Sequence, residues 1–350
     1  MKRLLPSRQA PKAANTPVGI IGAGAWGTAL AHHLAGCGQQ VLLWAYEKET
    51  MQNINRQHEN SQFLPGITLP NSVVATTNLD ELVSRCQVLL YTGPAQVMTE
   101  IATVVGPTLR PEQVLVICAK GLRETDGALL SEVWHEAAPS FKNLAVLTGP
   151  TFALEIAQGK TAAILLAAAD DSIIQQVDSL FTSAQIRLYY SNDMIGAQVG
   201  GALKNVLAIG AGINDGLQMG ANLKAAIMCR GVAEMMRYTR FLGGDEHTLA
   251  GLAGMGDLML TASSPQSRNY RFGLYLGEGL DVGAALKKVG ATVEGLHTAR
   301  IATVQATARG IDLGIVMAID GILSGDIEAG KALHFLLNRP RIREFGNSGH

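Results

Sequence analysis

The chain has few cysteines, few aromatic residues and few charged residues for its 350 positions. The four cysteines show no C-x-x-C spacing, which excludes a disulfide framework and the usual zinc sites and predicts buried thiols in a reducing compartment. They are Cys37, Cys86, Cys118 and Cys229. The 28 basic and 29 acidic residues nearly cancel, so no broad attraction to nucleic acid or to an anionic membrane follows.

Long hydrophobic runs are also missing. The longest, residues 162–169, is far too short to span a bilayer. We therefore expect a cytoplasmic protein with no integral membrane segment, no nucleic-acid partner and no metal. Residues 1–16 contain basic side chains but no acid, and they lack the apolar segment of a secretory signal. They predict a flexible N-terminal tail, with an organellar targeting peptide as the alternative.

What the chain does contain is apolar residues, at 47%, in two different patterns. In the first half, short apolar runs alternate with helical patterns such as 99–105 and 127–136, which indicates a largely parallel sheet covered on both faces. The expected strands are 18–21, 41–44, 88–91, 114–119, 144–148, 162–168 and 186–190. Long helical patterns then dominate. They are 200–213, 222–241, 267–276 and 298–308.

These patterns predict the fold class and the domains. We expect an α/β protein whose N-terminal doubly wound Rossmann-type domain, residues 17–190, precedes an all-helical C-terminal domain, residues 191–350. The first would bind a dinucleotide and the second a substrate.

The strongest single motif is a glycine-rich turn between a strand and a helix. The run Val18–Ile21 ends in Gly22, Gly24 and Gly27, followed by a helical pattern. In a G-x-G-x-x-G turn the first glycine allows the tight turn, the second lets a pyrophosphate approach and the third allows close helix–strand packing. The helix N-terminus then faces the anion. The alternative is a purely structural turn.

Polar residues follow two of the expected strands, where open α/β sheets bind ligands. Lys120 follows the strand 114–119, and Gly149-Pro-Thr151 follows the strand 144–148 at the start of a short helical pattern. A helix start of this kind can hold an anion. An ordinary surface lysine and a helix cap at Thr151 remain open as alternatives.

The helical half contains a lysine among small and apolar neighbours, Lys204, next to Asn205. Lost hydration disfavours a charged ammonium, so such a lysine can act as a base near neutral pH. Asp257 lies in a glycine-rich turn before an apolar run. A lysine that extends to solvent and an aspartate that only caps a helix are the alternatives.

Two further groups lie at helix starts. Ser267-Arg268-Asn269 offers a hydroxyl, a guanidinium and an amide, which suit a phosphate; the alternative is a capped helix with a solvated arginine. Glu294 precedes another helix and could accept a hydrogen bond from a ribose hydroxyl.

Taken together and in this order, these motifs resemble the NAD(P)-dependent glycerol-3-phosphate dehydrogenases of the bacterial type. The resemblance runs from about Val18 to Leu337. The matching stretches are residues 22–31, 119–122, 149–153, 200–206, 254–258, 267–269 and 293–295.

The resemblance implies roles for individual residues. Lys204 would accept the proton of the substrate hydroxyl. Asp257 and Asn205 would orient the Lys204 side chain. The substrate phosphate ester would be held by Lys120, Gly149, Thr151, Lys204, Asp257, Ser267, Arg268 and Asn269. The cofactor, NAD or NADP, would contact Gly22, Gly24, Ala25, Trp26, Gly27, Tyr46, Lys120, Ala153, Arg268 and Glu294. The product would supply the glycerol phosphate backbone of phospholipids.

The chain departs from this family at three places. Tyr46, followed by Glu47, stands where relatives often carry Arg or His toward a 2′-phosphate, which favours NAD slightly. The loop 90–96 is unusual, and Gly314 replaces a proline that relatives usually have. A related two-domain hydroxy-acid dehydrogenase and a non-catalytic nucleotide sensor remain alternative functions. The oligomeric state stays open, with a homodimer as the candidate.

Overall fold

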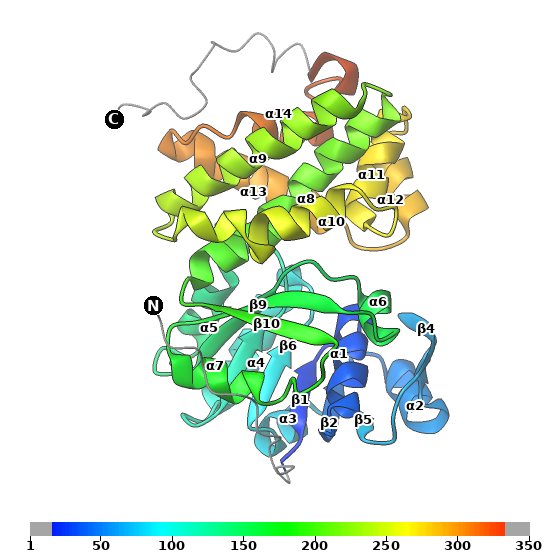
Figure 1. Ribbon diagram of the computed structural model, residues 1–350, viewed down its shortest axis with the longest axis vertical. Coiled ribbons are helices and arrows are strands. Elements are labelled where there is room, and N and C mark those ends of the chain that lie inside the picture. Colours follow the sequence, from blue (N-terminus) through cyan, green and yellow to red (C-terminus); the bar gives the residue numbers. More distant parts are fainter. Residues whose placement is uncertain (1–15, 333–350) are drawn as a thin grey trace.

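The computed structural model describes residues 16–332 and joins a sheet-containing half to a helical half (Figure 1). The sheet gives way to helices between β10, which ends at Ser191, and α8, which begins at Met194. The expected fold class is confirmed. The predicted N-terminal tail, apart from Thr16, and the last 18 positions lie outside the described residues.

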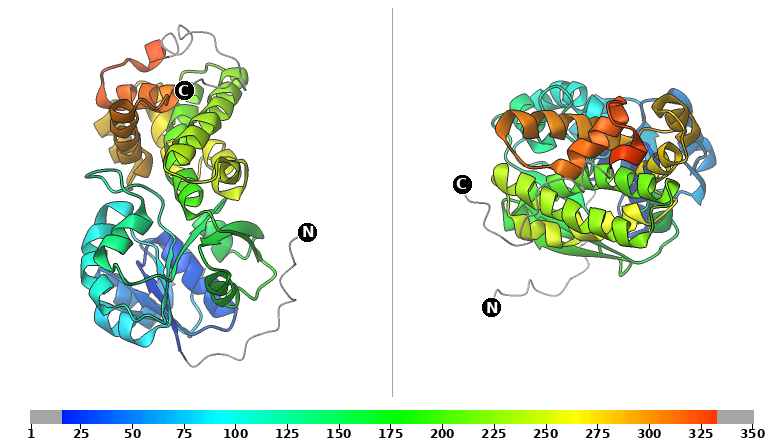
Figure 2. Two further views of the ribbon diagram at one scale, coloured as in Figure 1. Left: turned by 90° about the vertical axis from the view of Figure 1, so that its left-hand side faces the viewer. Right: turned by 90° about the horizontal axis from the view of Figure 1, so that it is seen from above.

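The first half contains an eight-stranded sheet in the order β10-β9-β8-β7-β6-β1-β2-β5, with helices on both of its faces (Figure 2). Its strands are β1 (Val18–Ile21), β2 (Val41–Trp44), β5 (Val73–Thr76), β6 (Val88–Tyr91), β7 (Val114–Ile117), β8 (Leu144–Thr148), β9 (Ala162–Ala168) and β10 (Ile186–Ser191). A small antiparallel pair consists of β3 (Glu59–Asn60) and β4 (Leu64–Thr68).

Short helices connect these strands. They are α1 (Ala25–Gly36), α2 (Lys48–Gln57), α3 (Leu79–Arg85), α4 (Met98–Val105), α5 (Leu130–Ala137), α6 (Ala153–Ala157) and α7 (Asp171–Asp178), with 3₁₀ turns at Ala95–Val97 and Gly106–Thr108. The strands β1, β6, β7 and β8 are buried at every position, which is why their sequences are continuously apolar.

The sheet differs from the sequence expectation in three respects. β9 pairs antiparallel with β8, because α6 has five residues and, at about 7.5 Å, is too short to return the chain along the sheet. β7 ends at Ile117, two residues early. β5 was not expected: it is an edge strand with Val74 half exposed, and its alternating burial gives only a weak apolar pattern.

The second half is helical. Its elements are α8 (Met194–Gly216), α9 (Ala221–Phe241), a 3₁₀ segment (Glu246–Ala250), a π-helical turn (Leu252–Gly256), α10 (Asp257–Ala262), α11 (Arg268–Gly277), α12 (Val282–Val289), α13 (Glu294–Arg309) and α14 (Gly314–Ser324). The helices α12 and α14 were not expected from the sequence, and α10 was expected only as the helix that Asp257 would cap.

Helix α8 is the core of this half and begins at the sheet (Figure 1). Among the described residues it is the one helix long and apolar enough to cross a membrane, but 89% of that window is buried inside the protein. Helix α11 crosses α8 at very short range: a Cβ at Gly273 would lie 2.0 Å from the carbonyl oxygen of Ile209. Glycine at the crossing therefore brings the start of α11 close to α8.

The cysteine prediction is partly wrong. All four are free thiols, and Cys86 and Cys118 are buried as expected. Cys229 is exposed on α9 and Cys37 is half-buried at the end of α1. Cys229 lies on the solvent side of an amphipathic helix, and a scattered cysteine carries no periodicity that would reveal this.

Candidate active site

The loop between β1 and α1 is shaped by its three glycines. Gly22 has a φ of +118°, and a Cβ at Gly27 would lie 1.9 Å from the carbonyl oxygen of Gly22. A Cβ at Gly24 would meet no atom within 4 Å, so the backbone there is open to an approaching group. No side chain caps α1, and the first-turn N–H groups are available to an anion. This cradle fits the pyrophosphate of a dinucleotide.

The same loop lies where the sheet changes direction. The chain proceeds from β1 to β2 and β5 on one side and returns to β6 on the other. The hydroxyl of Thr92, directly after β6, donates to the carbonyl oxygen of Gly22 at 2.8 Å. Ligands of doubly wound sheets bind at this switch point. Ala25 and Trp26, in the first turn of α1, are half-buried beside it.

Tyr46 follows β2 and is 80% exposed. Its ring stands edge-on to Trp44, with centroids 6.2 Å apart. The indole of Trp44 is in turn held by a hydrogen bond to the carbonyl oxygen of Thr77. Glu47 and Lys48, at the start of α2, are both exposed. The position beyond β2 therefore offers an aromatic ring and a carboxylate rather than a guanidinium.

A lysine–aspartate–lysine cluster lies where the two halves meet. Asp257, at the start of α10, is fully buried. Its Oδ1 accepts a hydrogen bond from Lys204 Nζ at 3.0 Å, and its Oδ2 accepts one from Lys120 Nζ at 2.5 Å. Lys120 also donates to the carbonyl oxygen of Gly149 at 3.1 Å. The structure thus brings together four of the residues singled out in the sequence.

Burial and charge act against each other in this cluster. Burial lowers the pKa of Lys204 to about 8 even though the Asp257 carboxylate acts in the opposite direction. Burial alone would raise the pKa of Asp257, but the ammonium groups of Lys120 and Lys204 outweigh it and hold that pKa low. Asp257 is therefore a carboxylate at neutral pH, while Lys204 can exchange a proton there.

The sequence missed one member of the cluster and misplaced another. Lys204 Nζ donates to the hydroxyl of Thr261 at 2.8 Å, one helical turn beyond Asp257. Asn205 was expected to orient Lys204, but its amide contacts the carbonyl oxygen of Gly201 and the side chain of Asn269 instead. Adjacent residues of a helix do not face each other, so the Asn205 side chain points away from Lys204. The i, i+4 spacing of Asp257 and Thr261 could have indicated the second contact.

The Ser267-Arg268-Asn269 group opens α11 as expected, and its three side chains have different environments. Ser267 caps the helix by accepting from the Tyr270 N–H at 3.2 Å. Asn269 is buried; it donates to Asn205 Oδ1 and accepts from the Gly295 N–H, both at 3.0 Å. Arg268 is exposed. The capping reading therefore holds for Ser267, and Arg268 is the group best placed to meet a mobile ligand.

Glu294 begins α13 and carries a buried carboxylate oxygen, Oε2, for which the protein supplies no hydrogen-bond partner. A Cβ at Gly121 would lie 3.1 Å from this oxygen, so glycine beside Lys120 leaves room for it. Burial raises the pKa of Glu294 to about 7, against the opposing charges of Arg268, Lys204 and Lys120. An unpartnered buried acceptor is satisfied by a donor from a ligand, such as a hydroxyl.

Thr151 and Ala153 lie after β8, at the start of α6. Thr151 is half-buried, and its hydroxyl donates to the carbonyl oxygen of Gly149 at 3.4 Å. The helix that follows, α6, has only five residues. An anion site at its N-terminus, as read from the sequence, is therefore not supported. Thr151 and Lys120 both donate to the carbonyl oxygen of Gly149, and Ala153 is the first residue of α6.

Two family models match almost the entire described chain. The N-terminal model of NAD-dependent glycerol-3-phosphate dehydrogenase matches residues 17–174, and the C-terminal model matches residues 193–334. The chain belongs to the NAD-dependent glycerol-3-phosphate dehydrogenase family.

Individual relatives agree with this assignment. A protein of Rhodospirillum rubrum named glycerol-3-phosphate dehydrogenase [NAD(P)+] is 42% identical over 94% of both chains. The crystal structure of a glycerol-3-phosphate dehydrogenase from Coxiella burnetii superimposes with a TM-score of 0.88, at 35% identity, over 93% of this chain and 99% of that one. A ketopantoate reductase from Ralstonia eutropha reaches a TM-score of 0.57 at 16% identity, over 91% and 100% of the two chains, and shares the fold only.

Proposed function

We propose that the protein interconverts sn-glycerol 3-phosphate and dihydroxyacetone phosphate with NAD(P). The oxidation converts sn-glycerol 3-phosphate and NAD(P)+ into dihydroxyacetone phosphate, NAD(P)H and a proton. The observation that carries the proposal is the buried Lys204 ammonium, held by Asp257 and Thr261 where the two halves meet. The nicotinamide ring, when bound, supplies or accepts the hydride.

Lys204 is the proton-transferring group. In the oxidative direction its neutral amine accepts the proton of the C2 hydroxyl, and in the reductive direction its ammonium returns a proton to the oxygen on C2. A pKa of about 8 allows both forms near neutral pH. The positive charge of the ammonium also stabilises the negative charge that develops on that oxygen.

Asp257 positions Lys204, because each carboxylate oxygen accepts from a different lysine. Without this carboxylate two ammonium groups would face each other in a buried site, which would disfavour protonation of Lys204. Lys120 thus contributes a second positive charge on the sheet side of the site, where it can reach substrate oxygen atoms.

Arg268 is the proposed phosphate-binding residue, with Asn269 behind it. Asn269 ties α11 to α8 through Asn205 and to α13 through the Gly295 N–H. The guanidinium is thereby carried on a helix start whose position relative to Lys204 is fixed. A guanidinium binds a phosphate with paired charge-assisted hydrogen bonds.

The dinucleotide lies across Gly22, Gly24 and Gly27, with Ala25 and Trp26 in the first turn of α1. Glu294 Oε2 supplies an acceptor for a ribose hydroxyl, and Ala153 and Lys120 complete the contacts. We further propose that NAD is used at least as well as NADP, because Tyr46 and Glu47 offer no cation to a 2′-phosphate.

The cellular setting is also part of the proposal. We propose that the protein acts in the cytoplasm and that its product supplies the glycerol phosphate of phospholipids. We also propose that it forms a homodimer. Size-exclusion chromatography with light scattering measures the molar mass of the assembly and so tests the proposed homodimer.

A substrate panel tests the proposed function. The full chain is incubated with NADH or NADPH and with dihydroxyacetone phosphate, dihydroxyacetone or ketopantoate, and the absorbance of the reduced cofactor is followed. We expect turnover of dihydroxyacetone phosphate, with dihydroxyacetone far slower because it lacks the phosphate. Faster turnover of ketopantoate would favour a hydroxy-acid dehydrogenase. Cofactor binding without any turnover would favour a nucleotide sensor.

A further inference from the structure

The loop after β6 packs against the glycine-rich loop, and its first residue, Thr92, has no part in the contacts proposed for the substrate or the cofactor. The backbone of Thr92 is fixed to β1, because its N–H donates to the carbonyl oxygen of Ile21 at 2.9 Å. Its hydroxyl donates to the carbonyl oxygen of Gly22 at 2.8 Å and lies 3.2 Å from that of Ile21. The Thr92 side chain therefore connects the end of β6 to the first glycine of the loop.

Gly27 leaves the space in which this hydrogen bond is made. A Cβ at Gly27 would lie 1.9 Å from the carbonyl oxygen of Gly22 and 2.5 Å from Thr92 Oγ1. The hydroxyl, the carbonyl group and the first turn of α1 thus meet at one point. The third glycine of the motif allows β1, α1 and β6 to come together there.

The next carbonyl of the loop is held from another direction. Asn60, in β3, is 1% exposed, and its amide nitrogen donates to the carbonyl oxygen of Ala23 at 2.8 Å. In a trans peptide the C=O group and the following N–H group point in opposite directions. Two donors, from β6 and β3, hold the carbonyls of Gly22 and Ala23. The N–H groups of Ala23 and Gly24 are therefore turned away from those donors.

The loop needs such anchors because glycine leaves its backbone free to rotate. Gly22 has a φ of +118°, and glycine populates several backbone conformations where other residues populate few. Rotation of the peptide between Gly22 and Ala23 would replace an N–H group by a carbonyl oxygen on the side that faces the N-terminus of α1. A carbonyl oxygen on that side repels an anion, whereas an N–H group attracts it.

We propose that Thr92 is a positioning residue for the dinucleotide. Its hydroxyl holds the Gly22 carbonyl, so that the loop presents N–H groups to the pyrophosphate before the cofactor binds. The inference rests on the proposed function, which places the pyrophosphate on this loop. The role concerns binding alone, so loss of the hydroxyl weakens the dinucleotide and leaves the hydride and proton transfers unchanged.

Two variants of the full chain isolate the hydroxyl. Thr92→Ser and Thr92→Ala both lack the methyl group, and only the serine keeps the donor. Calorimetric titration with NADH and with ADP-ribose, which has the pyrophosphate but no nicotinamide, measures binding without turnover. We expect Thr92→Ala to bind both ligands roughly fivefold more weakly than Thr92→Ser, the equivalent of one ordinary hydrogen bond. Thr92→Ser should remain within about twofold of wild type.

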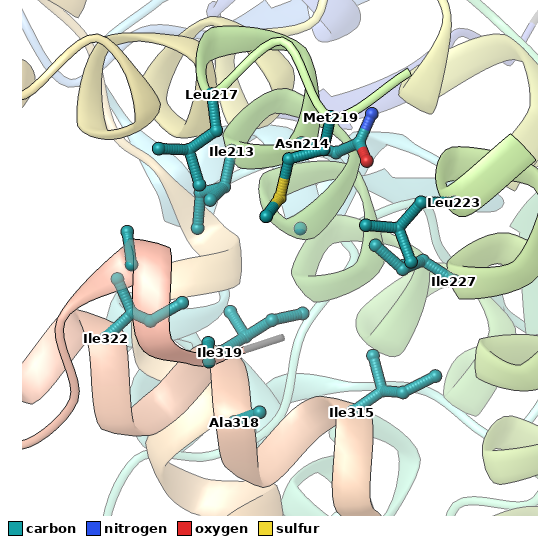
Figure 3. A pocket seen from close by; sticks show the side chains of 13 residues that line it. Ile213, Asn214, Leu217, Met219, Leu223, Ile227, Ile315, Ala318, Ile319 and Ile322 are labelled. Atoms are coloured by element: carbon teal, nitrogen blue, oxygen red, sulfur yellow. The ribbon is translucent and has the colours of Figure 1, made fainter. Parts of the chain in front are cut away.

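Steady-state kinetics give a second measurement. In Thr92→Ala the KM for NADH should rise by the same factor, while kcat and the KM for dihydroxyacetone phosphate stay within about twofold of Thr92→Ser. Thr99→Ala, the same change at an exposed position of α4, should change neither. Ile319→Val removes a methylene group beside a small apolar cavity between α8, α9 and α14 (Figure 3). It should lower Tm and leave the affinity for NADH unchanged.

Several outcomes would overturn the proposal. Equal affinity of Thr92→Ala and Thr92→Ser would do so, and so would a loss for NADH that ADP-ribose does not share. An equal loss of NADH affinity in Ile319→Val would reduce the role of Thr92 to general stability. Wild-type protein that binds neither ligand would refute the proposed function together with this inference. Binding without turnover would refute the dehydrogenase activity alone, and the comparison of the two Thr92 variants would still decide the inference.

Discussion

Lys204 and Asp257 form a buried ion pair, with Nζ 3.0 Å from Oδ1 and each side chain at most 8% exposed. The pair joins the middle of α8 to the start of α10, and Lys120 extends it to the sheet through the other carboxylate oxygen. A buried pair of this kind is weak evidence for stability, because its desolvation cost offsets its attraction. Its value here is that it holds a titratable amine in a fixed place.

Replacement of the proposed proton-transferring group gives the first prediction. Lys204→Met should reduce turnover by roughly 10²–10⁴-fold while leaving NADH binding within a few-fold of wild type. Steady-state kinetics and fluorescence titration measure the two effects. Lys287→Met, at an exposed lysine of α12, is the matched control. Turnover within about threefold of wild type in a folded Lys204→Met protein would refute the assigned role.

The pH dependence of the reaction follows from the same lysine. Oxidation needs the neutral amine and reduction needs the ammonium, and burial lowers the pKa of Lys204 to about 8. We expect kcat/KM for glycerol 3-phosphate to rise through about that pH and kcat/KM for dihydroxyacetone phosphate to fall through it. Asp257→Asn removes a charge that raises this pKa, so both inflections should move to lower pH by about one unit.

Asp80→Asn, at an exposed position of α3, is the control for the pH profile. It should leave both inflections in place. A profile that is unchanged by Asp257→Asn would show that another group titrates, and Glu294, with a pKa near 7, would be the next residue to change.

Loss of the guanidinium at the start of α11 should weaken substrate binding. Arg268→Ala is expected to raise KM for dihydroxyacetone phosphate at least tenfold, about 1.4 kcal/mol, and also to lower kcat, because phosphate binding orients the reacting carbon. Arg271→Ala changes an arginine of the same helix that contacts the carbonyl oxygen of Pro265 and should have little effect. If Arg268→Ala keeps the wild-type KM and kcat, Arg268 is a solvent-exposed residue at the start of α11 and does not bind the phosphate.

Cofactor preference should respond to the residue after β2. Wild-type protein is expected to use NADH at least as well as NADPH. Tyr46→Arg should shift the ratio of kcat/KM values toward NADPH by about tenfold, or roughly 1.4 kcal/mol. Tyr189→Arg places the same change on β10, at the other edge of the sheet, and serves as the control. A tenfold preference of the wild type for NADPH would contradict the reading of Tyr46 and Glu47; Lys48 would then be the residue to test.

Two glycines of the β1–α1 loop should behave differently. In Gly24→Ala the added Cβ has no protein atom within 4 Å. The Tm of this variant without cofactor should therefore be near that of wild type, while its affinity for NADH falls. Gly27→Ala would place a Cβ 1.9 Å from a backbone oxygen and should lower Tm as well. Gly36→Ala, an open position at the other end of α1, should change neither. Unchanged NADH affinity in Gly24→Ala would exclude close approach of the pyrophosphate there.

Much of the fold could be predicted because its causes are local. Short, largely apolar runs marked the seven strands that were expected, and Gly22, Gly24 and Gly27 marked the loop that follows β1. The edge strand β5 and the direction of β9 could not be read in this way. In β5 buried and exposed residues alternate, so its apolar pattern is weak. The direction of β9 depends on the length of α6, which is too short to return the chain along the sheet.

For the site, the sequence by itself determined which chemical groups are available: a lysine among apolar neighbours, an aspartate before an apolar run and an arginine at a helix start. Only the tertiary structure decided that Lys120 and Asp257, 137 positions apart, share a hydrogen bond, that Thr261 accepts from Lys204, and that Asn205 pairs with Asn269 instead. Helical spacing reports which face a residue occupies but not what packs against that face. That partner is set by the crossing of α8 with α10 and α11.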